Sequence, residues 1–185
     1  MAQRLSVEAR RAEILRTTRQ MIAEHGPEGL SLRAVARRCG MSAPGVLHHF
    51  DGLKPLLEAV LEQRDAEELE AFTTAIPENP TLLDWADTVV EVSTARMEEN
   101  HNFDALETQA LADPEHPAHD YYHRGYQLGP FPMTVRLAEQ DYPGNPQVVI
   151  ETLGTVIDGL RLRWLRSDTR ADYRADWRRI RDTVF

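Results

Sequence analysis

The stretch from Leu30 to Phe50 constrains this chain more than any other part of its sequence. It reads Leu-Ser-Leu-Arg-Ala-Val-Ala-Arg-Arg-Cys-Gly-Met-Ser-Ala-Pro-Gly-Val-Leu-His-His-Phe. Ser31 and Ser42 each precede an apolar repeat, and a serine hydroxyl can accept a hydrogen bond from the first turn of a helix. Gly40 lies between the two repeats, where a residue without Cβ turns at the lowest cost. Pro44 is tolerated in a first helical turn. Two short helices with a tight turn between them are therefore predicted.

The apolar positions of this segment predict how the two helices pack. The first inner face comprises Leu32, Val35 and Ala36, and the second comprises Val46, Leu47 and Phe50. Two short helices in this arrangement are typical of a helix-turn-helix, which places its second helix in the major groove of DNA. An ordinary corner between two helices is the alternative. The caps, the spacing and the local charge agree with one another and favour the DNA-binding interpretation.

Charge is distributed unevenly along the chain. The net charge is −9. Residues 1–55 carry nine basic and five acidic side chains, whereas residues 56–185 carry 12 basic and 25 acidic ones. Binding to phosphate requires positive charge locally rather than over the whole protein. The acidic remainder is expected to orient the basic end toward DNA.

Helical periodicity continues beyond this motif. We expect further helices over about residues 7–25, from 51 or 52 to 75, 82–98, 103–112, from 117 with a break at Gly129–Pro132, 146–165 and 171–184. Loops are predicted at 76–80 and 141–146, where prolines cluster. No strand pattern is found. The fold class is therefore all-α with about nine helices. A helix-turn-helix domain is expected over residues 1–52 and a helical bundle over residues 53–185.

The last two predicted helices are candidates for a subunit interface. Residues 146–165 are apolar around much of the helix surface, and such a helix is either central or covered by a partner. Together with residues 171–184 it could form a four-helix interface in a homodimer. Closing the core of a monomer is the alternative.

Several classes of protein are not indicated by the sequence. No apolar run reaches the length of a membrane span, and no secretory signal is recognisable. Cys39 is the single cysteine and excludes an internal disulfide, which suits the reducing cytoplasm. Glu98 and His101 form one Glu-x-x-His pair where a di-iron bundle needs two. No nucleophile elbow, P-loop or zincin motif occurs. We therefore expect neither an enzyme nor a cofactor.

Residues 10–61 carry a recognisable set of short motifs. They are Ile14-Leu15, Ala23-Glu-His-Gly26, Leu30-Ser-Leu-Arg-Ala-Val-Ala36, Cys39-Gly-Met-Ser42, Leu47-His-His-Phe50 and Leu56-Leu57. This segment resembles the N-terminal domain of the TetR family of bacterial transcriptional regulators. Two later pieces, His116-Pro-Ala-His119 and residues 158–165, look like parts of actinobacterial members of that family.

The resemblance implies an all-α homodimer that binds a palindromic operator in double-stranded DNA. The first three helices would contact DNA, the fourth would link, and the next three would enclose a pocket for a small-molecule effector. The last two helices, predicted over 146–165 and 171–184, would pair the subunits. The resemblance also implies a repressor that leaves its operator when the effector binds.

Ten residues are candidates for contact with DNA, and Leu47 is one of them. For the phosphate backbone we expect Arg33, Arg37, Ser42, His49 and Lys54. For base edges we expect the start of the second motif helix, namely Ala43, Pro44 and Gly45, together with His48. Because this helix lacks Arg, Asn and Gln, DNA shape or Arg4 in the N-terminal tail could add specificity.

Two positions depart from the usual pattern of the family. Leu47 stands where a tyrosine is usual, and it can offer only apolar contact, for example to a thymine methyl group. Leu53 stands where a lysine is usual, and Lys54 follows one residue later. One step turns a side chain by about 100° around a helix. Whether Lys54 reaches phosphate is left open by the sequence.

Candidates for the effector site combine aromatic or apolar residues with a few polar groups. The apolar candidates are Trp85, Val89, Met97, Phe103, Leu106, Tyr121, Tyr122, Tyr126 and Trp164. The polar candidates are Arg96, Gln109 and Asp158. Ordinary core packing is the alternative for each aromatic or apolar candidate.

Three histidines suggest a second functional class. His116, His119 and His123 are spaced to share one side of a helix, as in a Zn²⁺ or Ni²⁺ site. The chain would then be a metal-responsive regulator. A helical bundle that only binds proteins is a further alternative, and the basic N-terminal segment argues against it.

Overall fold

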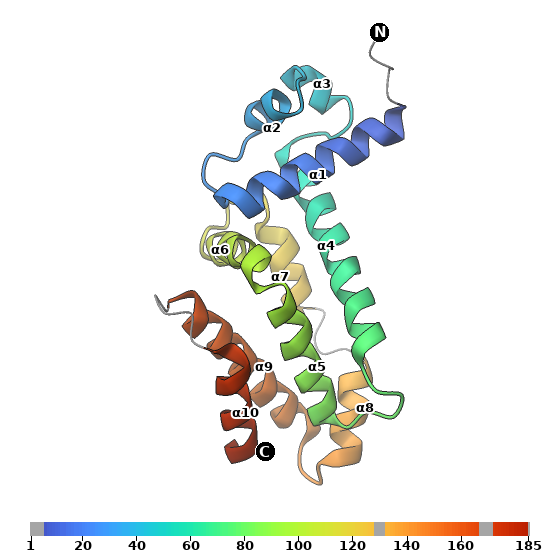
Figure 1. Ribbon diagram of the computed structural model, residues 1–185, viewed down its shortest axis with the longest axis vertical. Coiled ribbons are helices and arrows are strands. Elements are labelled where there is room, and N and C mark those ends of the chain that lie inside the picture. Colours follow the sequence, from blue (N-terminus) through green and yellow to red (C-terminus); the bar gives the residue numbers. More distant parts are fainter. Residues whose placement is uncertain (1–5, 128–131, 167–171, 185) are drawn as a thin grey trace. The chain divides into compact units, whose positions relative to one another are not determined.

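The computed structural model describes residues 6–127, 132–166 and 172–184. Over these ranges the chain forms ten helices and no strand (Figure 1). They are α1 (Val7–His25), α2 (Leu32–Arg38), α3 (Ala43–Leu47), α4 (Leu53–Ala75), α5 (Leu82–Ala95), α6 (Met97–Ala112), α7 (His119–Gln127), α8 (Pro132–Asp141), α9 (Pro146–Leu165) and α10 (Tyr173–Val184). The all-α prediction is confirmed. Among these helices, none is both long and apolar enough to cross a membrane.

The helices belong to two compact units. The first contains the chain up to Glu67 together with Glu98–Gln127, and the second contains Glu68–Met97 and Leu128–Phe185. The first unit therefore holds α1, α2 and α3, the first part of α4, and α6 and α7. The predicted domain boundary after residue 52 separates the residues expected to bind DNA from the rest of the chain, and it stays a prediction.

The N-terminal helices begin and end where the sequence predicts. The hydroxyls of Ser6, Ser31 and Ser42 accept hydrogen bonds from the backbone N–H groups of Ala9, Ala34 and Gly45, at 3.1, 3.2 and 3.2 Å. Gly26 ends α1 with φ of 70°, a conformation that side chains with a Cβ rarely adopt. Local hydrogen bonding therefore defines these three helices.

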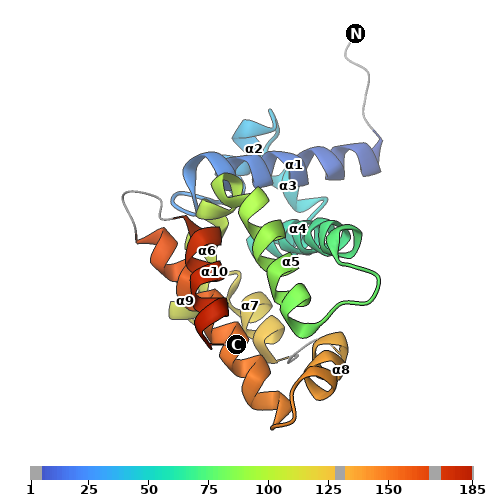
Figure 2. The same cartoon turned by 60° about the horizontal axis from the view of Figure 1, so that its bottom comes forward.

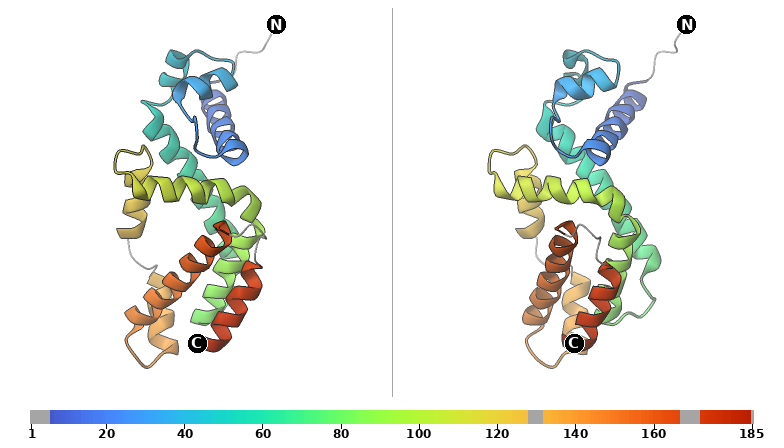
Figure 3. Two further views of the ribbon diagram at one scale, coloured as in Figure 1. Left: turned by 90° about the vertical axis from the view of Figure 1, so that its left-hand side faces the viewer. Right: turned by 60° about the vertical axis from the view of Figure 1, so that its left-hand side comes forward.

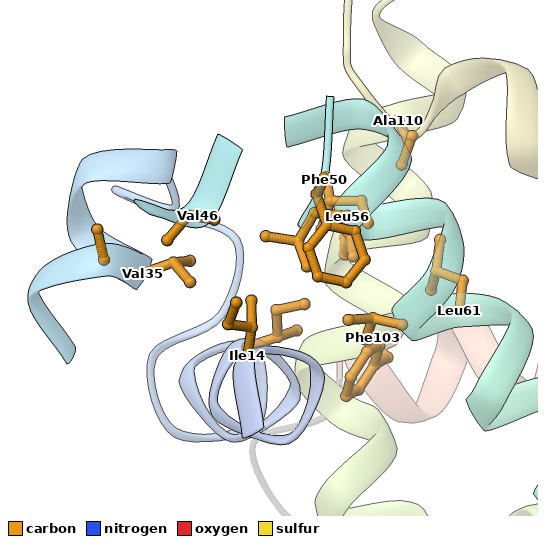
Figure 4. Packing of buried hydrophobic residues seen from close by; sticks show 14 residues of the cluster. Ile14, Val35, Val46, Phe50, Leu56, Leu61, Phe103 and Ala110 are labelled. Carbon is orange, nitrogen blue, oxygen red and sulfur yellow. The ribbon is translucent and has the colours of Figure 1, made fainter. Parts of the chain in front are cut away.

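One apolar core holds the first unit together. Figure 4 shows Ile14 of α1, Val35 of α2, Val46 of α3 and Phe50 pointing toward one another, with α4 and α6 contributing from the other side. Its buried members are Ile14, Ile22, Val35, Ala36, Val46, Phe50, Leu56, Leu57, Val60, Leu61, Phe103, Leu106, Ala110 and Ala118. Cys39 is a free thiol that packs against this core, as expected of a small apolar residue.

The structure corrects three expectations about single residues and helix ends. Leu47 was placed on the inner face of its helix, but its side chain is 45% exposed. The helix expected over 103–112 already begins at Met97 as α6, so Asn102 lies inside it. Its Nδ2 donates to the backbone carbonyl of Ala23 at 2.7 Å, which ties α6 to the last turn of α1. α5 ends at Ala95 rather than near Glu98 because α6 follows at Met97.

The predicted helix from residue 117 is two helices in the structure. α7 begins at His119 and ends at Gln127, and α8 begins at Pro132. Most of the predicted break at Gly129–Pro132 lies outside the described residues. This division accounts for ten helices over the described ranges rather than about nine.

The second unit is built from α5, α8, α9 and α10 (Figures 2 and 3). Thr81 caps α5 at the predicted start of the helix. Its hydroxyl accepts from the backbone N–H of Asp84, and the carboxylate of Asp84 accepts from the backbone N–H of Thr81. The core comprises Leu82, Ala86 and Val90 of α5 with Leu137, Ala138, Leu153, Leu160, Trp164, Tyr173 and Trp177 from the other three helices.

The carboxylate of Asp87 in α5 accepts hydrogen bonds from two side chains of α10, Trp177 and Arg181. The indole N–H of Trp177, which is only 2% exposed, donates to Asp87 Oδ1 at 2.7 Å. Arg181 Nη1 donates to the second carboxylate oxygen at 2.6 Å. One carboxylate therefore satisfies a buried donor and pairs with a cation on the same helix.

Replacing Asp87 by alanine should destabilise the protein by about 1–3 kcal/mol, because the indole N–H of Trp177 would be left buried without its acceptor. Urea denaturation at a fixed protein concentration measures the change. Asp182→Ala is the matched control, since Asp182 also accepts from Arg181 but is 64% exposed. It should cost less than about 1 kcal/mol. Equal losses in the two variants would contradict this role for Asp87.

Candidate DNA interface

α3 has a buried side and an exposed side. Val46 is fully buried, and Ala43 is half-buried against the core. Pro44, Leu47 and His48 are exposed, and their i, i+3, i+4 spacing places them on one face. These three residues are called the outward face of α3 below. Among the predicted base-reading residues, Pro44 and His48 lie on it.

Ser42 and Gly45 have local structural roles at the start of α3. The Ser42 hydroxyl accepts from the Gly45 N–H, which satisfies that N–H and leaves the hydroxyl proton of Ser42 able to donate. A Cβ added to Gly45 would lie 3.3 Å from both Met41 Cε and Ser42 Oγ. Close packing therefore accounts for the glycine. Contact of Ser42, Ala43 or Gly45 with DNA stays a prediction.

Arg11 of α1 supports the end of α3, a role that the sequence analysis did not assign. Its Nη1 donates to the backbone carbonyl of His49 at 2.9 Å. Its guanidinium carbon lies 4.0 Å from the ring centroid of Phe50. The rings of His48 and His49 meet edge to face, with centroids 5.5 Å apart. Nothing in the sequence distinguishes Arg11 from the neighbouring arginines of α1.

The arginines of the first three helices divide into paired and unpaired groups. Arg38 pairs with Glu24 at 2.7 Å, Arg19 with Glu67 at 2.7 Å, and Arg10 with Glu13 at 2.6 Å. Arg33 and Arg37 of α2 are exposed and form no ion pair with any described residue. The predicted phosphate contacts Arg33 and Arg37 are therefore available to an anion.

Lys54 at the start of α4 is paired with the carboxylate of Asp120 in α7. Both side chains are about half exposed. The hydrogen bond from Lys54, together with its positive charge, lowers the pKa of Asp120. Asp120 therefore neutralises part of the charge that Lys54 could offer to a phosphate.

Further contacts attach α7 to α4. Arg124 Nη2 lies 3.0 Å from Glu58 Oε1, and the Tyr121 hydroxyl donates to Asp65 Oδ2 at 2.6 Å. Burial, together with this bond and the negative charge of Asp65, raises the pKa of Tyr121. Tyr121 thus keeps its proton at neutral pH and acts as a hydrogen-bond donor.

The effector candidates of the first unit are mostly part of its interior. Phe103 and Leu106 are at most 1% exposed and belong to the core. Tyr122 is half-buried, and burial raises the pKa of its hydroxyl, which has no hydrogen-bond partner. Gln109 is exposed. The side chain of Tyr126 lies outside the described part.

The remaining effector candidates lie in the second unit. Trp85 and Met97 are half-buried against its core, where the rings of Trp85 and Phe72 meet with centroids 6.3 Å apart. Trp164 is buried in that core. Val89 and Arg96 are half-buried, and Asp158 is exposed on α9. An effector role stays a prediction for all these residues.

The three histidines do not form the metal site that the spacing suggested. His116 lies before α7, and its Nδ1 accepts from the backbone N–H of Ala118 at 3.1 Å. A ring nitrogen of His119 is hydrogen-bonded to the carbonyl of Ala110 at 2.8 Å. His119 and His123 stack with parallel rings. Over the described ranges, no three His, Cys, Asp or Glu side chains converge as a metal site would require.

The segment that carries this candidate interface matches a known protein family. The family model described as "Bacterial regulatory proteins, tetR family" matches residues 14–60, which run from α1 into α4. This segment of the chain is therefore similar to the tetR-family domain.

Curated relatives match less than half of the chain. The transcriptional repressor AcnR of Corynebacterium efficiens is 30% identical over 91 residues, which are 45% of this chain and 48% of AcnR. The transcriptional regulator Rv1816 of Mycobacterium tuberculosis is 34% identical over 85 residues, 45% of this chain and 36% of the regulator. The chain thus spans at most about half the length of these relatives. Both are named as regulators, in agreement with the prediction that the chain is not an enzyme.

Solved structures of TetR-type proteins share the fold over nearly the whole chain. A TetR-family protein from Rhodococcus sp. superposes with a TM-score of 0.73 at 21% identity, covering 95% of this chain and 98% of that one. A regulator from Pseudomonas aeruginosa gives 0.70 at 21% identity, covering 98% and 91%. The likeness therefore extends through both units as a likeness of fold.

Arg11→Met should lower the free energy of unfolding by about 1 kcal/mol, because it removes the hydrogen bond to His49 and the contact with the Phe50 ring. Arg16→Met is the matched control on the same helix, since Arg16 is exposed and has no ion pair with a described residue. It should change stability by less than about 0.5 kcal/mol. Thermal and urea denaturation at a fixed protein concentration measure both. Equal behaviour of the two variants would show that Arg11 does not support α3.

Proposed function

We propose that this protein is a transcriptional repressor that binds double-stranded operator DNA through α1, α2 and α3. The observation that carries the proposal is the exposed face of α3 beside the unpaired Arg33 and Arg37, within the segment that matches the TetR family model. The proposed DNA-binding domain comprises residues 1–52. Phosphates would be contacted by Arg33, Arg37, His49 and Lys54, and bases by the outward face of α3.

The proposed repressor acts as a homodimer. A helix-turn-helix protein reads a palindromic operator as a dimer, because the two half-sites follow the two-fold axis of the protein. The proposed interface consists of α9 and α10. It is supported by the exposed apolar side chains Val148, 56% exposed, and Leu162, 38% exposed, both on α9. A dimer interface would remove them from water.

The proposed repressor is released from its operator by a small molecule that binds residues 53–185. The support is the match of residues 14–60 to the family model together with the fold likeness across residues 53–185. The chemistry of the effector is left unassigned, because the candidate side chains are mostly apolar and select no ligand class.

DNA binding and its salt dependence test the proposal. The full-length protein should select a palindromic duplex from fragments of its own genome, and log Kd should vary linearly with log salt concentration. The double variant Arg33→Ala and Arg37→Ala should reduce this slope by about 3.6, since the dimer loses four phosphate contacts and each contributes about 0.9.

The control is the double variant Arg136→Ala and Arg166→Ala. Both arginines are exposed in the second unit and form no ion pair with a described residue, so their loss should leave the slope unchanged. Failure to prefer any duplex, or a monomer in analytical ultracentrifugation, would contradict the proposed function.

Freeing Lys54 should strengthen DNA binding. In Asp120→Asn the ammonium loses its charged partner, and a surface ion pair of this kind is worth about 0.2–1 kcal/mol. Because the proposed dimer carries two such lysines, the Kd for the operator should fall by up to about 30-fold. Glu115→Gln is the control for the same change in net charge, because the exposed Glu115 side chain has no ion pair with a described residue. An equal gain in both variants would mean that the pairing with Lys54 does not matter.

A further inference from the structure

Leu47 is an apolar side chain on the surface of the proposed DNA interface. It is 45% exposed, and the core of the first unit is complete without it. A single exposed leucine is common on protein surfaces and carries no conclusion by itself. This one shares the outward face of α3 with Pro44, so two apolar groups lie next to each other where the helix would meet its target.

The charge around this face indicates what covers it. Arg33 and Arg37 on the preceding helix are exposed and form no ion pair with described residues. Positively charged side chains together with an apolar face fit a binding partner whose surface is anionic at its edges and carries apolar groups between them. The major groove of DNA has this composition, with phosphates along both sides and thymine methyl groups on its floor.

α3 offers few hydrogen bonds to a base. Leu47 and the Pro44 ring have no donor, and the Gly45 N–H is already bonded to Ser42 Oγ, so Ser42 adds only its own hydroxyl proton. His48 is the one side chain of the outward face that can donate. The thymine methyl is the apolar feature by which the major groove distinguishes one base from the others.

We infer that Leu47 reads a thymine in each operator half-site through its C5-methyl group. Pro44 extends the apolar contact, and His48 supplies the hydrogen bond of this face. The inference rests on the proposed function and adds the chemical group that is recognised. It also explains how a helix poor in donors selects a sequence.

Deoxyuridine tests the contact directly, because it lacks the C5-methyl group and keeps the pairing and the O4 acceptor of thymine. Each thymine of the selected duplex is replaced in turn, symmetrically in both half-sites, and Kd is measured with the full-length protein. Burial of one methyl group changes affinity about fourfold, so two half-sites should raise Kd about 15-fold at one position.

Variants assign that effect to Leu47. In Leu47→Ala, the ratio of the Kd for the uracil duplex to that for the thymine duplex should fall from about 15 to about 1. Leu111→Ala is the matched control, since Leu111 lies on α6 and is 47% exposed. It should keep the ratio of the wild-type protein. Circular dichroism confirms that both variants fold.

Three results separate this inference from the proposed function. Selection of no duplex overturns the proposed function itself. A selected duplex with the expected salt dependence, but with equal affinity for every uracil replacement, overturns the methyl contact alone. A position sensitive to uracil that stays equally sensitive in Leu47→Ala assigns the methyl contact to another residue and also overturns the inference.

Discussion

The packing of Val46 and Phe50 against α1 is the interaction on which the candidate site depends. α3 contains five residues, far fewer than an isolated helix needs to be stable in water. Val46 is fully buried and Phe50 is 3% exposed, and both contact a core to which α1 contributes Ile14 (Figure 4). The hydrogen bond of Arg11 to the carbonyl of His49 adds a polar link at the end of the helix. The outward face of α3 is therefore positioned by residues that do not themselves reach DNA.

The distribution of ion pairs gives the acidic chain a cationic surface. Net charge alone describes the whole protein and would not favour binding to a polyanion. Glu13, Glu24 and Glu67 pair with arginines of α1 and α2. Arg33 and Arg37 remain unpaired with described residues, and they belong to the helix that packs against α3. The positive charge available to bind DNA therefore depends on which basic side chains lack a carboxylate partner.

α7 contributes to the same surface through Lys54. The sequence places this lysine one residue later than the family pattern, and the structure shows it bound to Asp120. Two further contacts, Arg124 with Glu58 and Tyr121 with Asp65, hold α7 on α4. A change in the position of α7 would therefore alter the availability of a cation at the proposed interface.

Much of the local architecture could be predicted because it depends on near neighbours in the chain. The caps Ser6, Ser31, Ser42 and Thr81 bond to groups three residues away, and such patterns are visible in the sequence. Apolar periodicity placed Val35, Ala36, Val46 and Phe50 on inner faces, and all four are buried. It was wrong for Leu47, because the short α3 turns this residue away from the core while Val46 faces it.

The sequence by itself determined the helical class, the caps, the helix-turn-helix and the resemblance to a family, all of which rest on contacts within a few residues. The tertiary structure decided which side chains remain exposed or charged at the interface. Arg11 meets His49 across 38 residues, Asn102 meets Ala23 across 79, and Lys54 meets Asp120 across 66. These pairs form only when helices distant in the sequence pack together, and neither periodicity nor spacing carries information about them.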